Sequence, residues 1–122
     1  MRRLLPLALY IHVWKIESMI LECARLDVLP GQEGAFLTAF AEARPLIAVQ
    51  HGFRTLELRR CLDEGRGSRF LLLVAWDRLE DHTQGFRRSP EYQKWRALLH
   101  HFYSPFPEVE HYGEPLIGGQ GE

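Results

Sequence analysis

The segment from Arg69 to Trp76 reads RFLLLVAW and is apolar at every position after Arg69. An apolar run of this length, preceded by a polar glycine-containing stretch and followed by Asp77, is typical of a β-strand. A strand with one face in water alternates apolar and polar residues, and this one does not, so it must be covered on both faces. We therefore predict a central strand, with helices on one face of its sheet and a second apolar surface on the other.

Three other segments have strand-like composition, at residues 19–28, 53–60 and 109–112. Residues 63–68 are polar and contain glycine, which is typical of a hairpin connection. Between the first two strands, apolar residues recur at helical spacing and form one stripe of Phe36, Ala39, Phe40, Ala43 and Ile47. This pattern predicts a helix from Gln32, with a kink or break at Arg44-Pro45.

A second helical region follows the central strand in two pieces. Asp77 is expected to cap the first piece, because its carboxylate can accept from the free amides of a helix start. Ser89-Pro90 is expected to begin the second piece as capping residue and first helical residue. The inward residues are expected to be Leu79, His82, Thr83 and Phe86 in the first piece and Tyr92, Trp95, Leu99 and Phe102 in the second.

The resulting order, β-α-β-β-α-β, predicts a ferredoxin-like α+β fold with a four-stranded antiparallel sheet. Right-handed connections place both helices on the same face of such a sheet. The opposite face of the apolar central strand is then bare in a single chain. An exposed apolar face of this size favours association, so we predict a homodimer that packs through its sheet faces.

The predicted domain covers residues 19–113. Residues 114–122 contain three glycines and are expected to be a flexible tail. Residues 1–18 place two arginines before an apolar stretch, but Pro6 and His12 interrupt it. Because Met19 opens the first strand, residues 1–18 are expected to be an extension outside the fold, from a start codon assigned upstream; a cleaved signal peptide is the alternative. The stretch is too short to span a membrane, so no membrane association is expected.

Charge and cysteine content exclude several classes of protein. The 122-residue chain has a net charge of −1 and no long run of one sign, so it lacks the basic field that nucleic-acid binding requires. Its two cysteines, Cys23 and Cys61, are expected to be buried free thiols in a reducing cytoplasm. No Cys-x-x-Cys or His-x-x-x-His pair occurs, so no metal motif is predicted.

His82 is the strongest candidate for chemistry, because it lies on the inward stripe of the first helical piece. A neutral imidazole there can accept a proton as a general base near working pH. The alternative is a hydrogen-bonded histidine at the edge of the core. His111 in the last strand is a weaker candidate, since strand parity alone leaves its direction open. A three-histidine metal site from His82, His101 and His111 is a minor alternative.

Aromatic residues near His82 are candidates for binding a flat ring. They are Trp76, Phe86, Tyr92 and Trp95, and the alternative is that this stripe is simply core. Glu22 interrupts an otherwise apolar strand face, where a carboxylate is unusual. It is predicted to orient a histidine or to hydrogen-bond a substrate, with an ion pair to an arginine at the dimer interface as the alternative. Arg87-Arg88 is either a solvated pair or a guide for an anionic substrate.

The segment from Ala75 to Trp95 resembles the core of antibiotic biosynthesis monooxygenase (ABM) domains. In that family a tryptophan ends the third strand, and a helix, a Ser-Pro break and an aromatic-rich helix follow, as with Trp76 and Ser89-Pro90 here. Pro30-Gly31-Gln32-Glu33 resembles the family's entry to its first helix. The resemblance extends from Met19 to Tyr112.

This resemblance implies a dimeric α+β barrel, with a pocket between the helices and the sheet of each subunit. It also implies cofactor-independent oxygenation of a quinol or polyphenol-like molecule, with no bound cofactor. Characterised oxygenases of the family commonly use an asparagine, and this sequence contains none. Phe86 stands where many members carry a histidine, which makes haem binding less expected. A non-catalytic dimer that binds an aromatic small molecule is the alternative function.

Overall fold

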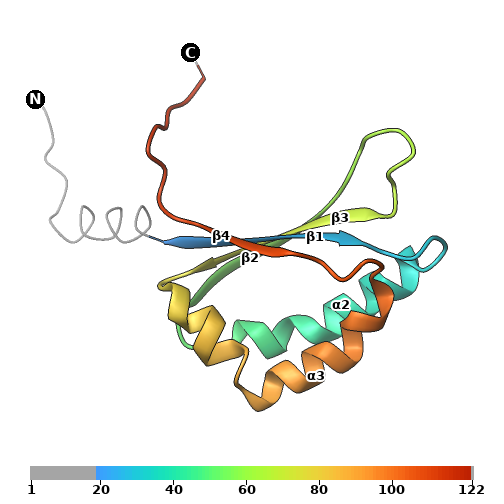
Figure 1. The fold of residues 1–122 in the computed structure, drawn as a ribbon, viewed down its shortest axis with the longest axis horizontal. Helices are drawn as coiled ribbons and strands as arrows, with labels where there is room; N and C mark the ends of the chain where they lie inside the picture. Colours follow the sequence, from blue (N-terminus) through green and yellow to red (C-terminus); the bar gives the residue numbers. More distant parts are fainter. Residues whose placement is uncertain (1–18, 122) are drawn as a thin grey trace, which may run out of the picture.

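The computed structural model describes residues 19–121 (Figure 1). The predicted extension at residues 1–18 lies outside this part of the chain. The elements are β1 (Ile20–Asp27), α2 (Glu33–Ala48), β2 (Phe53–Arg60), β3 (Arg69–Trp76), the π-helical turn η1 (Asp81–Phe86), α3 (Pro90–Leu99), the 3₁₀ turn η2 (His100–Phe102) and β4 (Val109–Tyr112). This order confirms the predicted β-α-β-β-α-β sequence of elements.

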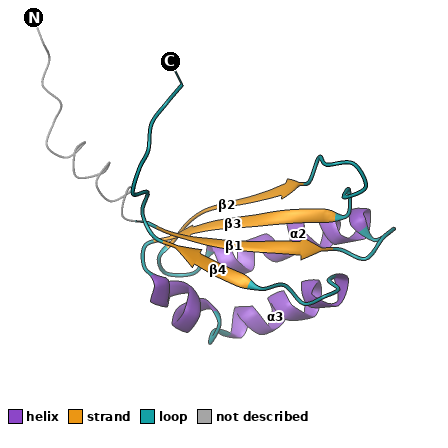
Figure 2. Ribbon diagram, turned by 45° about the horizontal axis from the view of Figure 1, so that its top comes forward, coloured by secondary structure: helices purple, strands orange, loops and turns teal. Residues whose placement is uncertain are grey.

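The four strands form one antiparallel sheet in the order β2-β3-β1-β4, with the apolar strand β3 in the interior. Figures 1 and 2 show α2 and α3 side by side on one face of this sheet. Both observations confirm the ferredoxin-like α+β fold. Register also matters for the site: Glu22 on β1 lies opposite Val74 on one side and His111 on the other.

The core lies between the sheet and the two helices. Alternate residues of β3 point into it because successive side chains of a strand face opposite sides of the sheet. The helix α2 contributes its predicted stripe, with Phe36, Phe40, Ala43 and Ile47 all buried. The buried residues of β1 and β3 are Ala24, Leu26, Phe70, Leu72, Val74 and Trp76.

The outer sheet face, away from the helices, carries the other residues of the same strands. Its apolar members are Leu21, Cys23, Leu71, Leu73, Ala75 and Tyr112. Leu71 is 40% exposed and Leu21 is 38% exposed. No other described element packs over this face, so the second covering surface predicted for β3 does not come from residues 19–121 of the same chain.

Two local features differ from the predictions, namely the break allowed at Pro45 and the burial of the cysteines. The helix α2 does not break at Pro45, which lies in its last turn, where the Pro45 carbonyl still accepts from the amide of Val49 at 3.2 Å. A proline this close to the end removes only one helical hydrogen bond. The two cysteines, Cys23 and Cys61, are unpaired but half-buried rather than buried.

The turn after β3 also differs from the prediction. Asp77 does not cap a helix; it pairs with Arg54 on β2 at 2.5 Å. The Arg78 amide donates instead to the Asp81 carboxylate, at 3.1 Å. The first helical residue is Leu79, and it is 39% exposed rather than inward. His82 remains buried, as predicted.

Gly52, in the turn between α2 and β2, packs closely against Asp81. Its φ is +81°, and a Cβ added there would overlap the carboxylate of Asp81. We expect Gly52→Ala to destabilise the fold by more than the about 1–2 kcal/mol that a left-handed backbone costs any residue with a side chain. Urea unfolding measures this. Gly65→Ala is the matched control, because Gly65 has a φ of +77° and open space around it. Equal losses in the two variants would contradict the close packing at Asp81.

Candidate functional site

A cavity of about 380 Å³ lies between the helices and the β1–β4 side of the sheet. The strands supply Glu22, Ala24, Leu26, Leu72 and Val109; the turn η1 and the residue after it supply His82, Phe86 and Arg87. The rest of the lining is Tyr92, Trp95, His100, Tyr103, Phe106 and Pro107. Most of these side chains are aromatic or aliphatic, and the acidic and basic groups are few, which is typical of a small-molecule site.

At one end of the cavity the carboxylate of Glu22 is held by two neighbours. Glu22 is only 5% exposed, and its Oε1 accepts from the indole nitrogen of Trp76 at 2.9 Å. The Nε2 atom of His82 lies 3.5 Å from the same oxygen. A buried carboxylate requires such partners, since burying it without them would be very unfavourable.

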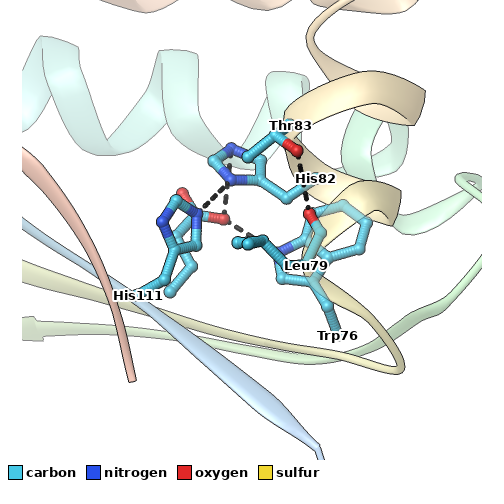
Figure 3. Close-up of polar contacts among 6 residues, drawn as sticks. Trp76, Leu79, His82, Thr83 and His111 are labelled. Atoms are coloured by element: carbon cyan, nitrogen blue, oxygen red, sulfur yellow. Dashed lines mark hydrogen bonds and ion pairs between the residues drawn. The ribbon is translucent and has the colours of Figure 1, made fainter. Parts of the chain in front are cut away.

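His82 connects this carboxylate to a second histidine. Its Nδ1 lies 2.7 Å from Nε2 of His111, so one ring nitrogen donates to the other (Figure 3). The indole of Trp76 stacks on the His82 ring, with centroids 5.5 Å apart and planes 24° apart. Figure 3 shows His82 above the sheet, with His111 and Trp76 reaching it from below. Three elements, η1, β3 and β4, thus fix one imidazole.

Burial raises the pKa of Glu22 and lowers the pKa values of His82 and His111. It raises the pKa of Glu22 from 4.5 to about 7, opposed by the Trp76 hydrogen bond and the positive charge of Arg87. It lowers the pKa of His82 from 6.5 to about 3, and the charges of Arg87 and His111 act in the same direction. The pKa of His111 is lowered by burial and by Arg87. His82 is therefore neutral at pH 7, where Glu22 is close to half protonated.

The other end of the cavity is aromatic. Phe86 meets Tyr92 and Trp95 edge to face, with centroids 5.2 Å and 5.4 Å apart. Tyr103 lies across the cavity, and burial raises the pKa of its hydroxyl. Tyr92 lies in the first turn of α3, where Ser89 caps the helix as predicted and accepts from the Tyr92 amide at 3.2 Å. Phe106 lies at the open side and is 65% exposed.

The structure brings most of the predicted site residues together. Glu22, His82, Phe86, Tyr92 and Trp95 line one cavity. Trp76 does not line it; the indole lies behind His82 and orients that ring. His111 does not line it either, but reaches His82 from the half-buried strand β4. The open question of strand parity is thereby answered, since Glu22 and His111 are cross-strand neighbours on the helix-facing side.

Several lining residues were not predicted. Tyr103 and Phe106 belong to the connection between α3 and β4, which folds back over the cavity. His100, the C-cap residue of α3, also borders the cavity. The sequence signal was the aromatic residues among the prolines at 103–107, which helix and strand periodicity does not detect.

Residues 19–121 contain no group of three or more His, Cys, Asp or Glu side chains arranged to hold a metal ion. The three-histidine alternative fails because His101 is exposed and faces away from the cavity lining. Arg87, one of the two arginines weighed as a guide for an anion, does border the cavity, whereas Arg88 does not.

Comparison with known proteins agrees with this architecture. The sequence model of the family "Antibiotic biosynthesis monooxygenase" matches residues 19–98. The uncharacterized protein YczJ of Bacillus subtilis is 50% identical over 94 residues, which are 77% of this chain and 97% of YczJ. The chain therefore belongs to the antibiotic biosynthesis monooxygenase (ABM) family.

Solved structures give the same assignment. A Bordetella bronchiseptica protein classed as an antibiotic biosynthesis monooxygenase is 33% identical, with a TM-score of 0.75 over 81% of this chain and 99% of that one. SnoaB of Streptomyces nogalater, a cofactor-independent oxygenase, is 16% identical, with a TM-score of 0.69 over 82% of this chain and 96% of SnoaB. At that identity SnoaB supports the fold alone. In the part of the chain described here, no helix is long and apolar enough to cross a membrane.

Proposed function

We propose that this protein is a cofactor-independent monooxygenase that acts on a quinol or polyphenol-like aromatic molecule. The observation that carries the proposal is the pair of buried residues Glu22 and His82 at one end of an aromatic-lined cavity, with the half-buried His111 in contact with His82. Membership of the ABM family supports it.

The proposed chemistry begins with a proton transfer. A phenolic O–H bond of the substrate breaks, its proton goes to the polar end of the cavity, and the electron pair stays on the substrate. The resulting phenolate is rich enough in electrons to reduce dioxygen. One oxygen atom is inserted into the ring and the other leaves as water, with substrate as the electron donor. Phe86, Tyr92 and Trp95 would hold the ring in place during these steps.

Oxygen uptake with a panel of simple quinols tests the proposal. We expect the wild-type protein to consume oxygen and to release the hydroxylated quinone. His82→Ala and Phe86→Ala should each lose most of this activity, because the first removes the imidazole that contacts Glu22 and His111 and the second removes part of the aromatic wall. His101→Ala is the matched control, because His101 is exposed and outside the cavity. Full activity in both site variants would place the reaction elsewhere.

The second candidate is a dimer that binds an aromatic molecule without turnover. It is favoured by the complete lack of asparagine in this chain. A ligand that binds only the folded state raises the unfolding temperature. A quinol that raises Tm without oxygen uptake would support this alternative. Haem binding is less favoured, and a flat Soret region on haemin titration would dismiss it.

The homodimer is part of the same proposal, with a second copy of the chain on the outer sheet face. On this face Leu71, Leu73 and Ala75 of β3 form an apolar row, with Arg25 of β1 beside Leu71 and Glu57 of β2 beside Leu73. We expect Leu71→Asp to shift the protein from dimer to monomer, because a carboxylate buried between two sheets would be unpaired. Light scattering after gel filtration measures this. Leu62→Asp is the control, since Leu62 is 94% exposed in the β2–β3 connection. An unchanged dimer in Leu71→Asp would exclude this face.

A further inference from the structure

The two oxygens of the Glu22 carboxylate have different surroundings. Oε1 is held by the Trp76 indole at 2.9 Å and faces His82 Nε2 at 3.5 Å. Oε2 makes no hydrogen bond to any described residue. No enclosed side-chain polar atom of the described chain lacks a partner. Since Oε2 has no such partner, it is not among the fully buried atoms, and Glu22 lines the cavity. One oxygen is fixed by the fold and the other is open to a bound molecule.

The hydrogen-bond network also assigns the tautomers of both histidines. An ionised carboxylate can only accept, so in the form of Glu22 that is able to act as a base, Oε1 is an acceptor both for the Trp76 indole and toward His82. The nitrogen of His82 that faces Oε1 then carries the hydrogen, which leaves Nδ1 of the neutral ring as an acceptor. At 2.7 Å, His111 must donate its Nε2 hydrogen to that atom. Both ring nitrogens of His82 are thus engaged inside the protein, and neither is free to take a proton from a ligand.

We propose that Glu22, through Oε2, is the group that accepts the proton from the ligand's hydroxyl, and that His82 and His111 are positioning residues. This inference rests on the proposed function and deepens it, since the sequence alone favoured His82 as the base. In the step proposed, the ligand O–H bond breaks, an O–H bond forms at Oε2, and the electron pair remains on the ligand oxygen. Trp76 and His82 keep Oε1 as the acceptor in both protonation states.

The charges around Glu22 suit this role. Trp76 on β3 and His111 on β4 are its polar neighbours within the sheet, and His82 and Arg87 approach from η1 and the residue after it. Burial raises the pKa of Glu22 to about 7, so the carboxylate is available as a base and strong enough to hold a proton near neutral pH. Arg87 at the cavity lining is the nearby cation for the phenolate that forms.

Glu22→Gln and His82→Gln separate the two assignments. A glutamine at position 22 keeps a carbonyl oxygen for Trp76 and His82 but cannot take a proton. In oxygen-uptake kinetics we expect Glu22→Gln to lower kcat about 100-fold with little change in KM, and to abolish the pH dependence near 7. His82→Gln should lose less and should move that pH dependence rather than abolish it. Larger loss in His82→Gln than in Glu22→Gln would overturn the proposal.

A second experiment needs no turnover, so it remains decisive if the proposed oxygenase activity fails. The probe is 4-nitrocatechol, whose absorbance reports its ionisation. At pH 7, where about half of Glu22 is ionised and can accept a proton, we expect binding to the wild-type protein and to His82→Gln to increase the phenolate band, and binding to Glu22→Gln not to do so. Carbon-13 NMR of the glutamate carboxyls, assigned with Glu22→Gln, should show one group that titrates near 7. A Glu22 signal that titrates in the ordinary range near 4.5, or a phenolate band that persists in Glu22→Gln, would overturn the inference.

Discussion

Replacement of Phe36 by alanine is expected to lower the free energy of unfolding by about 3–5 kcal/mol. Phe36 is fully buried in α2, and its ring is surrounded by other aromatic rings. Its centroid lies 5.1 Å from that of Phe70 and 5.8 Å from that of Phe102. The loss has two parts. The variant lacks the free energy that the native protein gains by transferring the Phe36 ring from water to the core, and the rigid neighbours of Phe36 leave a cavity in the variant.

This loss is large for a domain of this size, whose total stability is on the order of 5–15 kcal/mol. Urea unfolding followed by circular dichroism gives the measurement, with the midpoint expected to fall and the m value to stay constant. Leu37→Ala is the matched control, since Leu37 is the next residue of the same helix and is 42% exposed. A loss in Phe36→Ala no greater than that in Leu37→Ala would mean that α2 does not pack on the sheet through Phe36.

Glu22 is expected to make stability fall as pH rises toward neutrality. Its pKa is raised to about 7 in the folded protein from 4.5. The folded state therefore binds the proton more tightly, and the stability this contributes is complete below pH 4.5 and is lost as pH rises through 7. The loss amounts to roughly 3 kcal/mol. Glu22→Gln removes it, so the variant should gain on the wild-type protein by about this amount between pH 5 and pH 8.

His82 acts in the opposite direction and must be separated from this effect. Its pKa is lowered to about 3, so its contribution is present above pH 6.5 and is lost as pH falls toward 3. The difference between Glu22→Gln and the wild-type protein isolates Glu22, provided that His82 titrates alike in both. Urea unfolding at pH 5 and pH 8 measures the difference. Glu108→Gln is the control, because Glu108 is exposed. A difference that does not change with pH would contradict the raised pKa of Glu22.

Much of the fold was predictable from patterns in the chain. The apolar run of β3 required an interior strand, and β3 lies between β2 and β1. The helical spacing from Phe36 to Ile47 identified the buried face of α2. These predictions are confirmed because period and burial are local properties of a sequence. The turn at 77–86 was the exception: which of Asp77 and Asp81 caps it depends on Arg54 and Gly52, which are more than twenty residues away.

The candidate site was likewise predictable from the sequence only in part. Glu22 and His82 stood out in the sequence because each is a polar residue on an apolar face, and polar groups on such faces require a reason. Their contacts with His111 could not be predicted from the sequence, since the pairing of β1 with β4 joins residues far apart in the chain. Which oxygen or nitrogen is left free for a ligand is likewise decided by the hydrogen bonds from Trp76 and His111.

The chain by itself thus determined the layers of this protein, namely a four-stranded sheet with one face under two helices and one face bare. It also determined which polar residues enter the core. Only the tertiary structure decided which of those residues contact one another, because the contacts join groups brought together from β1, β3, β4 and η1. Burial periodicity is encoded residue by residue, whereas the chemistry of Glu22 is set by the neighbours that the completed sheet supplies.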